Sequence, residues 1–166
     1  TASGPLAVDF SPRPNAAAWA QWRFGAWHYG CQSPLIYNQL DAHVRDPQPE
    51  RLTRLTRQIR GHRLRNNFSW INNYYDDMAW LALALERAAR VAGVERRRAL
   101  PKLADQLVRA WVPEDGGGIP WRKQDQFFNA PANGPAVIFL TRYGDPLRPA
   151  QKIADWIDGT RSDPET

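Results

Sequence analysis

The chain has 166 residues, of which 43% are hydrophobic and eight are tryptophan, and its formal net charge is +5. This length is enough for one domain with a buried core, and the hydrophobic fraction is ordinary for a globular protein. A single cysteine, Cys31, excludes a disulfide within the chain, and the sequence has no hydrophobic run long enough to cross a membrane.

Proline, glycine and the spacing of apolar residues predict six helices after an irregular lead-in over residues 1–15. In chain order we expect them at 16–44, with a bend at Pro34, and at 49–64, 74–92, 95–111, 131–143 and 149–158. Glycines are expected to end the third, fifth and sixth helices, and no segment has the alternation typical of a strand. We expect His28 and Cys31 to lie in the core.

The predicted helices alternate between two kinds. Those at 16–44, 74–92 and 131–143 are apolar nearly all round or rich in aromatic residues, so each should be buried on most sides. The other three are amphipathic. This order predicts an all-α fold made of inner and outer helical hairpins, as in a toroid. The loops that lead into inner helices are long, and long loops that share one rim of a scaffold are where sites are usually built.

Two adjacent carboxylates, Asp76 and Asp77, stand at the start of the third predicted helix. Capping of the helix explains one of them, but two like charges repel and should raise the pKa of one carboxyl group. Pairs of carboxyl groups of this kind commonly serve as acid and base in the cleavage of a glycosidic bond. Neighbouring helical residues can bring carboxyl groups about 5 Å apart, which suits a retaining mechanism. A metal site is the less favoured alternative, because this rim offers few further carboxylates beyond Glu114, Asp115 and Asp125.

Two motifs carry a resemblance to a known family. The segment NNYYDDMAWLALALERA, at 72–88, resembles the signature of glycoside hydrolase family 76, bacterial and fungal enzymes that act on α-1,6-linked mannan. The segment GGGIPWRKQDQFFNAPANGPA, at 116–136, is similar to that family's second signature. The match covers about 66–142, with weaker likeness on both sides. It implies an (α/α)6 barrel and cleavage of α-1,6-mannosidic linkages by retaining double displacement, without a cofactor or metal.

The resemblance also implies roles for individual residues. Asp76 would be the nucleophile and Asp77 the general acid/base. The residues implied to contact the substrate are Tyr74, Tyr75, Trp80, Trp121, Asn129, Asn133, Gly117 and Gly118. For the two asparagines the alternative is capping of the helix that follows, and for the two glycines it is a plain turn.

Two other functions stay open on the sequence alone. A protein of the same fold could have lost turnover and serve as a carbohydrate-binding or scaffold protein, although a pure binder would not need both aspartates. The net positive charge, which comes almost entirely from arginine, makes nucleic-acid binding a second function to consider. However, the arginine-rich segment at 51–65 lacks aromatics and a known module, so we interpret it as a solvated helix face.

We therefore expect a mannan or another mannose-containing glycan as the partner, no nucleic acid and no membrane span. The expected catalytic domain, 16–166, holds three helical hairpins, whereas the family's barrel has six pairs. We accordingly expect either a missing C-terminal half, as in a truncated enzyme, or a homodimer. The compartment stays open between the cytoplasm and, if a signal peptide has been removed, the cell envelope or exterior.

Overall fold

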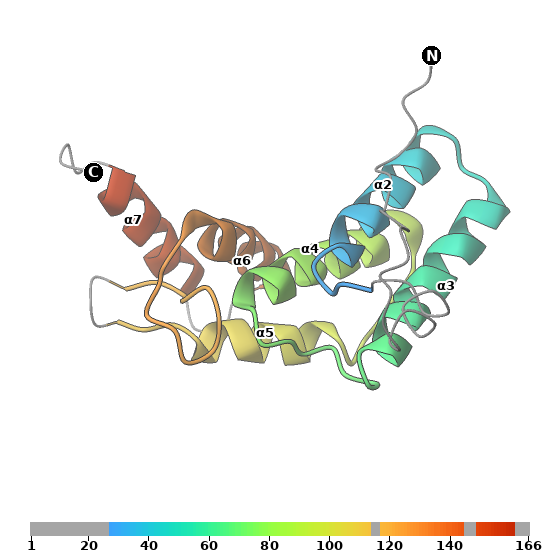
Figure 1. Cartoon of the computed structure of the whole chain (residues 1–166). Helices are drawn as coiled ribbons and strands as arrows, with labels where there is room; N and C mark the ends of the chain where they lie inside the picture. The colour runs from blue at the N-terminus through green and yellow to red at the C-terminus, as the bar shows by residue number, and fades with distance from the viewer. Residues whose placement is uncertain (1–26, 114–116, 145–148, 162–166) are drawn as a thin grey trace, which may run out of the picture.

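The computed structural model describes residues 27–113, 117–144 and 149–161, so the predicted lead-in and the first part of the first predicted helix lie outside it. The described residues form six helices (Figure 1). They are α2 (Gln32–Arg45), α3 (Pro49–Arg65), α4 (Tyr75–Ala92), α5 (Leu100–Arg109), α6 (Ala130–Tyr143) and α7 (Pro149–Arg161). This part of the chain has no strand, only two isolated bridges between loop residues. None of these helices is long and apolar enough to cross a membrane.

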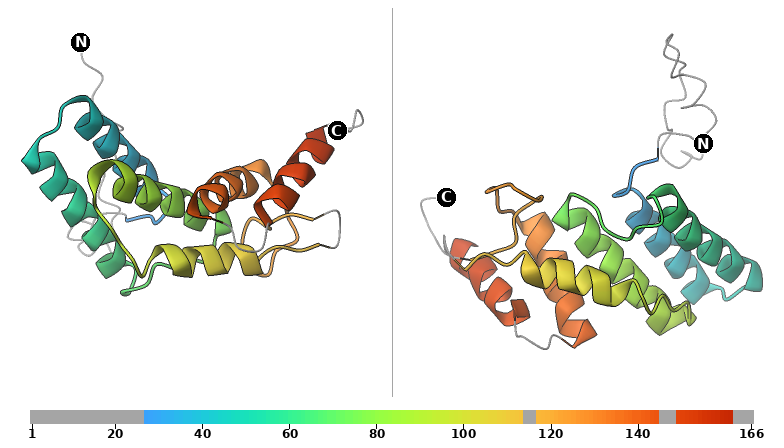
Figure 2. Two further views of the ribbon diagram at one scale, coloured as in Figure 1. Left: turned by 180° about the vertical axis from the view of Figure 1, so that it is seen from behind. Right: turned by 90° about the horizontal axis from the view of Figure 1, so that it is seen from below.

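The helices pack as three hairpins. Helix α4 lies between α2 and α6, and each of α3, α5 and α7 packs against the inner helix that precedes it. Figure 1 shows the resulting open arc, with α3 and α7 at its two ends, and Figure 2 shows the same arc from behind and from below. The predicted alternation of inner and outer helices is confirmed, and the described part of the chain forms about half of a helical toroid.

Helix α4 is the centre of the core. Its alanines and leucines favour the helical state, and Met78, Leu81 and Leu85 are at most 1% exposed. Burying a leucine side chain contributes about 2 kcal/mol, so this helix anchors both neighbours. It ends at Gly93, whose φ of 64° is the left-handed conformation that glycine adopts readily. The predicted end of this helix is therefore confirmed.

The first helix differs from the prediction. It begins at Gln32, because residues 29–31 form a turn closed by the Gln32 N–H and the Tyr29 carbonyl at 3.1 Å. Pro34 lies in the first turn of α2, where an N–H has no partner within the helix, so proline does not interrupt it. His28 and Cys31 are exposed, not in the core, whereas Tyr29 between them is buried.

Two other boundaries also differ. Helix α5 begins at Leu100 instead of 95, because Pro101 fits the first turn of a helix and the residues before it close the end of α4. There the Val94 N–H donates to the Ala88 carbonyl at 3.0 Å. Helix α7 continues through Gly159 to Arg161, since glycine inside a helix is unfavourable by only about 1 kcal/mol.

Candidate active site

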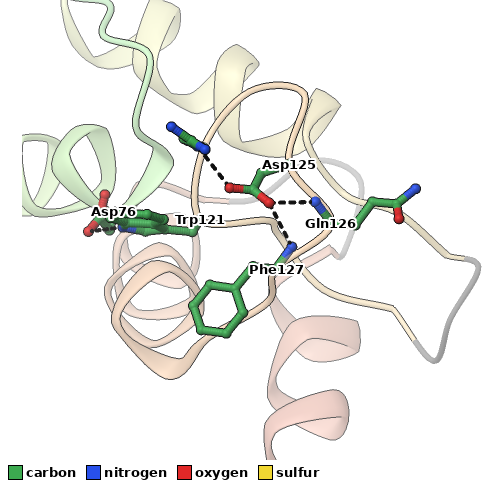
Figure 3. Close-up of polar contacts among 6 residues, drawn as sticks. Asp76, Trp121, Asp125, Gln126 and Phe127 are labelled. Carbon is green, nitrogen blue, oxygen red and sulfur yellow. Dashed lines mark hydrogen bonds and ion pairs between the residues drawn. The ribbon is translucent and has the colours of Figure 1, made fainter.

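The paired aspartates lie in the first turn of α4. One oxygen of Asp76, Oδ1, accepts the backbone N–H of Asp77 at 2.8 Å. The other, Oδ2, accepts the indole N–H of Trp121 at 2.9 Å (Figure 3). Asp76 is thus held in one orientation by two donors, one from its own helix and one from a distant loop.

Asp77 has different surroundings. Its Oδ2 accepts the side-chain amide of Asn72 at 2.6 Å, and its Oδ1 lies against the backbone of Gly30, where an added Cβ would be only 2.2 Å away. Burial, and next the charge of Asp76, raise the pKa of Asp77 to about 6, against the opposing hydrogen bond from Asn72. The raised pKa expected for one carboxyl group of the pair therefore falls on Asp77.

The loop at 117–129 is fastened to the start of α4. The Tyr75 N–H donates to the Trp121 carbonyl at 2.9 Å, and the Lys123 N–H donates to the Asn73 carbonyl at 2.9 Å. The Trp121 ring meets Tyr74 edge-on at a centroid distance of 5.2 Å. These contacts join two loops that are far apart in the sequence and place the Trp121 indole beside Asp76.

Asp125 holds the same loop in shape. Its Oδ2 accepts the Nε–H of Arg122 at 2.8 Å, and its Oδ1 accepts the backbone N–H groups of Gln126 and Phe127 at 2.9 and 3.2 Å (Figure 3). The hydrogen bond from Arg122 is the main cause that lowers the pKa of Asp125. This carboxylate is therefore occupied within its loop. The Phe127 ring, 58% exposed, stands at right angles to the Trp121 ring, with centroids 6.4 Å apart.

A metal site was the alternative considered for the carboxylates of this rim. Within the described ranges, no group of three or more histidine, cysteine, aspartate or glutamate residues is placed to hold an ion. Glu114 and Asp115, two of the carboxylates considered for a metal, lie outside those ranges.

Three of the predicted sugar-contacting aromatics surround the pair. Trp80 lies one helical turn after Asp76, so both project from the same face of α4, and its side chain is 45% exposed. Tyr74 and Tyr75 are partly buried. Burial raises the pKa of Tyr75, which keeps its hydroxyl protonated. An exposed tryptophan beside two carboxyl groups offers a flat apolar surface to a sugar ring.

The two predicted asparagines hold the start of α6. Asn129 is its N-cap and accepts the Ala132 N–H at 3.0 Å. Asn133 is fully buried, and its amide accepts the Ile119 N–H at 2.7 Å and donates to the carbonyls of Ile119 and Asn129, both at 2.8 Å. Asn133 thus has no free polar group for a sugar in this conformation, and it ties the loop to α6. The capping role considered as the alternative is thus shown for Asn129, and a contact of either asparagine with a substrate stays a prediction.

The two predicted glycines bring the loop onto aromatic side chains. Gly117 and Gly118 have φ values of 90° and 130°, which other residues rarely adopt. An added Cβ would lie 2.6 Å from the Trp111 ring at Gly117 and 3.0 Å from the Phe128 ring at Gly118. Both glycines are therefore required by the packing of the loop, whatever they contact in a substrate.

Comparison with solved structures identifies the architecture. The GH76A α-1,6-mannanase from Salegentibacter sp. HEL1_6 superposes with a TM-score of 0.76 at 26% identity, over 84% of this chain and 44% of that one. This chain has a GH76-like fold. An inactive variant of that mannanase, with two consecutive aspartates replaced by asparagine and in complex with α-1,6-mannotriose, gives a TM-score of 0.75 at 25% identity, again over 84% and 44%.

The Lin0763 protein from Listeria innocua has a similar fold, with a TM-score of 0.69 at 23% identity over 89% of this chain and 43% of that one. The chain therefore spans less than half the length of these structural neighbours. No protein-family model matches the sequence, and no curated protein matches it either.

Three residues of this candidate site make contacts that the sequence did not predict. Asn72 and Gly30 contact Asp77, and Asp125 shapes the loop that carries Trp121. Asn72 lies within the first motif and could have been proposed from its place before the aspartates. Gly30 gives no such signal, because its contact with Asp77 exists only once α2 and α4 pack together.

Proposed function

We propose that this chain carries the catalytic aspartates of a glycoside hydrolase that cleaves α-1,6-mannosidic linkages by a retaining double displacement. The observation that carries the proposal is the pair of adjacent carboxyl groups held in different environments. Asp76 accepts two hydrogen bonds that hold its carboxyl group in one orientation. The pKa of Asp77 is raised to about 6, so Asp77 holds a proton in mildly acidic solution. Two carboxyl groups in such different environments supply the nucleophile and the acid of retaining glycosidases.

In the first step, the Asp76 carboxylate attacks the anomeric carbon of a mannose residue. Asp77 gives its proton to the glycosidic oxygen as that bond breaks, so the leaving sugar departs as a neutral alcohol. The product is a covalent mannosyl ester on Asp76. The Trp121 indole, which donates to Oδ2 of Asp76, orients the carboxylate for attack, and holding a nucleophile in place is worth several kcal/mol of the barrier.

In the second step, the ionised Asp77 takes a proton from water, and the resulting hydroxide attacks the same carbon. The bond to Asp76 breaks, its carboxylate is restored, and the sugar is released with the α-configuration it started with. Two inversions at one carbon give net retention. Asp77 ends the cycle protonated, ready to act as the acid again.

Three observations support an α-1,6-mannan as the substrate. The exposed Trp80 and Phe127 and the partly buried Trp121 give aromatic surface around the carboxyl pair, and aromatic rings stack on the apolar faces of sugars. The structural neighbours include α-1,6-mannanases. An inactive variant of one of them, changed at two consecutive aspartates, is in complex with α-1,6-mannotriose, and this chain also has two consecutive aspartates beside the aromatic surface.

The experiment is hydrolysis of α-1,6-linked mannan, followed by time-resolved NMR. We expect the α-anomer to form first, and D76N and D77N each to lose turnover by several orders of magnitude while still folding. D105N, which removes an exposed carboxylate on α5, is the matched control. A β-anomer formed first would refute retention, and near-native turnover by D76N would refute the assignment of the nucleophile.

The same assay separates this proposal from the second candidate. A carbohydrate-binding or scaffold protein of this fold would bind α-1,6-mannotriose without releasing products, and D76N would not change its behaviour. Because the described residues form about half of a toroid, we also propose that further helices, from the same chain or from a second copy, complete the cleft. Light scattering across a concentration series distinguishes a homodimer from a monomer.

A further inference from the structure

Two separate segments of the chain contact Asp77, the proposed acid. Gly30, in the turn at 29–31, lies against its Oδ1, and Asn72, in the loop at 66–74, donates to its Oδ2 at 2.6 Å. Burial is the largest cause of the raised pKa of Asp77. The position of these two segments therefore decides how much water reaches the carboxyl group.

A buried hydrogen bond joins the two segments directly. The Tyr29 hydroxyl donates to the Trp70 carbonyl at 2.5 Å, and both residues are 6% exposed. Tyr29 is the neighbour of Gly30, and Trp70 lies two positions before Asn72. Each member of the bond thus stands beside a residue that contacts Asp77. Because a buried carbonyl that loses its donor is unfavourable, the bond keeps the turn and the loop together.

His62 of α3 packs against both members of this hydrogen bond. Its ring meets Tyr29 edge-on at a centroid distance of 4.5 Å and lies nearly parallel to Trp70 at 6.1 Å. Burial lowers the pKa of His62 to about 4, so the imidazole is uncharged where the proposed acid titrates. The loop at 66–74 has no charged side chain. The charge that acts on the proposed acid therefore comes from its neighbour, Asp76.

The Tyr29 hydroxyl keeps its proton whether Asp77 is protonated or ionised. Burial, and next the charge of Asp77, raise the pKa of Tyr29 well above its usual value. The hydroxyl therefore stays a donor to the Trp70 carbonyl at every pH at which the proposed acid changes its charge. A bond that persists through this titration can hold the acid in one place during a catalytic cycle.

We propose that Tyr29 is a positioning residue for the acid. Through its bond to Trp70 it holds the turn at 29–31 and the loop at 66–74 closed around Asp77, and it thereby keeps water away from the carboxyl group. Because Tyr29 is buried, it acts through Asp77 and not by contact with a sugar. The catalytic meaning of this role rests on the proposed function, whereas the effect of Tyr29 on Asp77 exists without a substrate.

The test is Y29F, which keeps the ring and removes the hydroxyl. We expect the loop to separate from the turn and admit water, so that the pKa of Asp77 moves about one pH unit toward its ordinary value. This is measured by ¹³C NMR of the carboxyl carbon in the full chain without substrate. Y37F is the matched control, since it removes a hydroxyl of α2 whose ring lies beside Arg87, and it should leave the pKa of Asp77 unchanged.

Hydrolysis of α-1,6-linked mannan gives the second readout. In Y29F the alkaline limb of kcat/KM should move down by the same pH interval, and kcat should fall about tenfold because the acid is less well placed. KM should stay unchanged. Y29F/N72A should lose less than the product of the two single losses, because both changes act on one carboxyl group. Losses that multiply would mean that Tyr29 acts elsewhere and would overturn the proposal.

The NMR titration separates this inference from the proposed function. An unchanged pKa of Asp77 in folded Y29F would overturn the inference even if mannan is hydrolysed. A wild type that cleaves no mannan would refute the proposed function and leave the titration to decide the role of Tyr29. If Y29F does not fold, the wild type decides, since the amide signals of Tyr29 and Trp70 should titrate together with Asp77. Signals that do not move through that titration would overturn the proposal.

Discussion

Because the two aspartates have different environments, we expect the stability of the protein to depend on pH. The substitution Asp77→Asn should remove the part of this dependence that comes from Asp77. The pKa of Asp77 is raised from 3.8 to about 6 by burial and by Asp76. That difference corresponds to about 3 kcal/mol, and solvent screening of a half-buried group reduces it to about 1–2 kcal/mol. Because the unfolded chain ionises at the lower pH, the wild type loses this stability as pH rises from about 4 through 6.

At pH 7.5 we therefore expect D77N to be more stable than the wild type by about 1–2 kcal/mol, or about 2–8 °C in Tm. Urea unfolding followed by tryptophan fluorescence, measured at pH 7.5 and pH 4, gives the free energies directly. The advantage of D77N should shrink to a fraction of its value at pH 4, where Asp77 keeps its proton in the folded state. A difference between the two proteins that is the same at both pH values would refute the reasoning, and D105N should show no such dependence.

Three further outcomes follow from the site. W121F keeps an aromatic ring but removes the donor to Asp76, so kcat should fall about 10–100-fold, as expected for a hydrogen bond to a charged group, and an unchanged kcat would count against this role. G30A should displace the Asp77 carboxylate and abolish turnover, whereas G61A, with nothing near its added Cβ, should gain about 0.5–1 kcal/mol of stability. Finally, kcat/KM should fall about tenfold per pH unit above about pH 6, where Asp77 loses its proton, and a profile flat to pH 8 would exclude it as the acid.

The helix boundaries show which features of this fold are local. The starts at Pro49 and Pro149 and the ends at Gly93 and Gly144 were predicted to within a residue, because proline and glycine impose the backbone angles that begin or end a helix. Residues 29–31 were predicted as helix and form a turn instead. Their conformation depends on Asp77 and on neighbouring helices, which no local pattern reveals.

The candidate site divides in the same way. The aspartate pair and Trp121 were predicted to share a site because their motifs keep the residues in a fixed order, and the structure places Trp121 in direct contact with Asp76. The buried network of Asn133 was not predicted, since an asparagine at the start of a helix gives the same sequence signal whether its amide faces solvent or backbone. The contact between Gly30 and Asp77 joins segments 47 positions apart and depends wholly on packing.

The fastening of the loop at 117–129 to the start of α4 has a consequence for the dynamics of the molecule. The Tyr75 N–H donates to the Trp121 carbonyl, and the Lys123 N–H donates to the Asn73 carbonyl, so neither amide can exchange with solvent unless the loop detaches from the start of α4. Hydrogen exchange at these two amides should therefore occur together, in one opening event that also withdraws the indole from Asp76. The frequency of that opening sets how often Asp76, the proposed nucleophile, lacks the hydrogen bond from Trp121. Opening of the loop therefore sets the fraction of molecules that are ready to react.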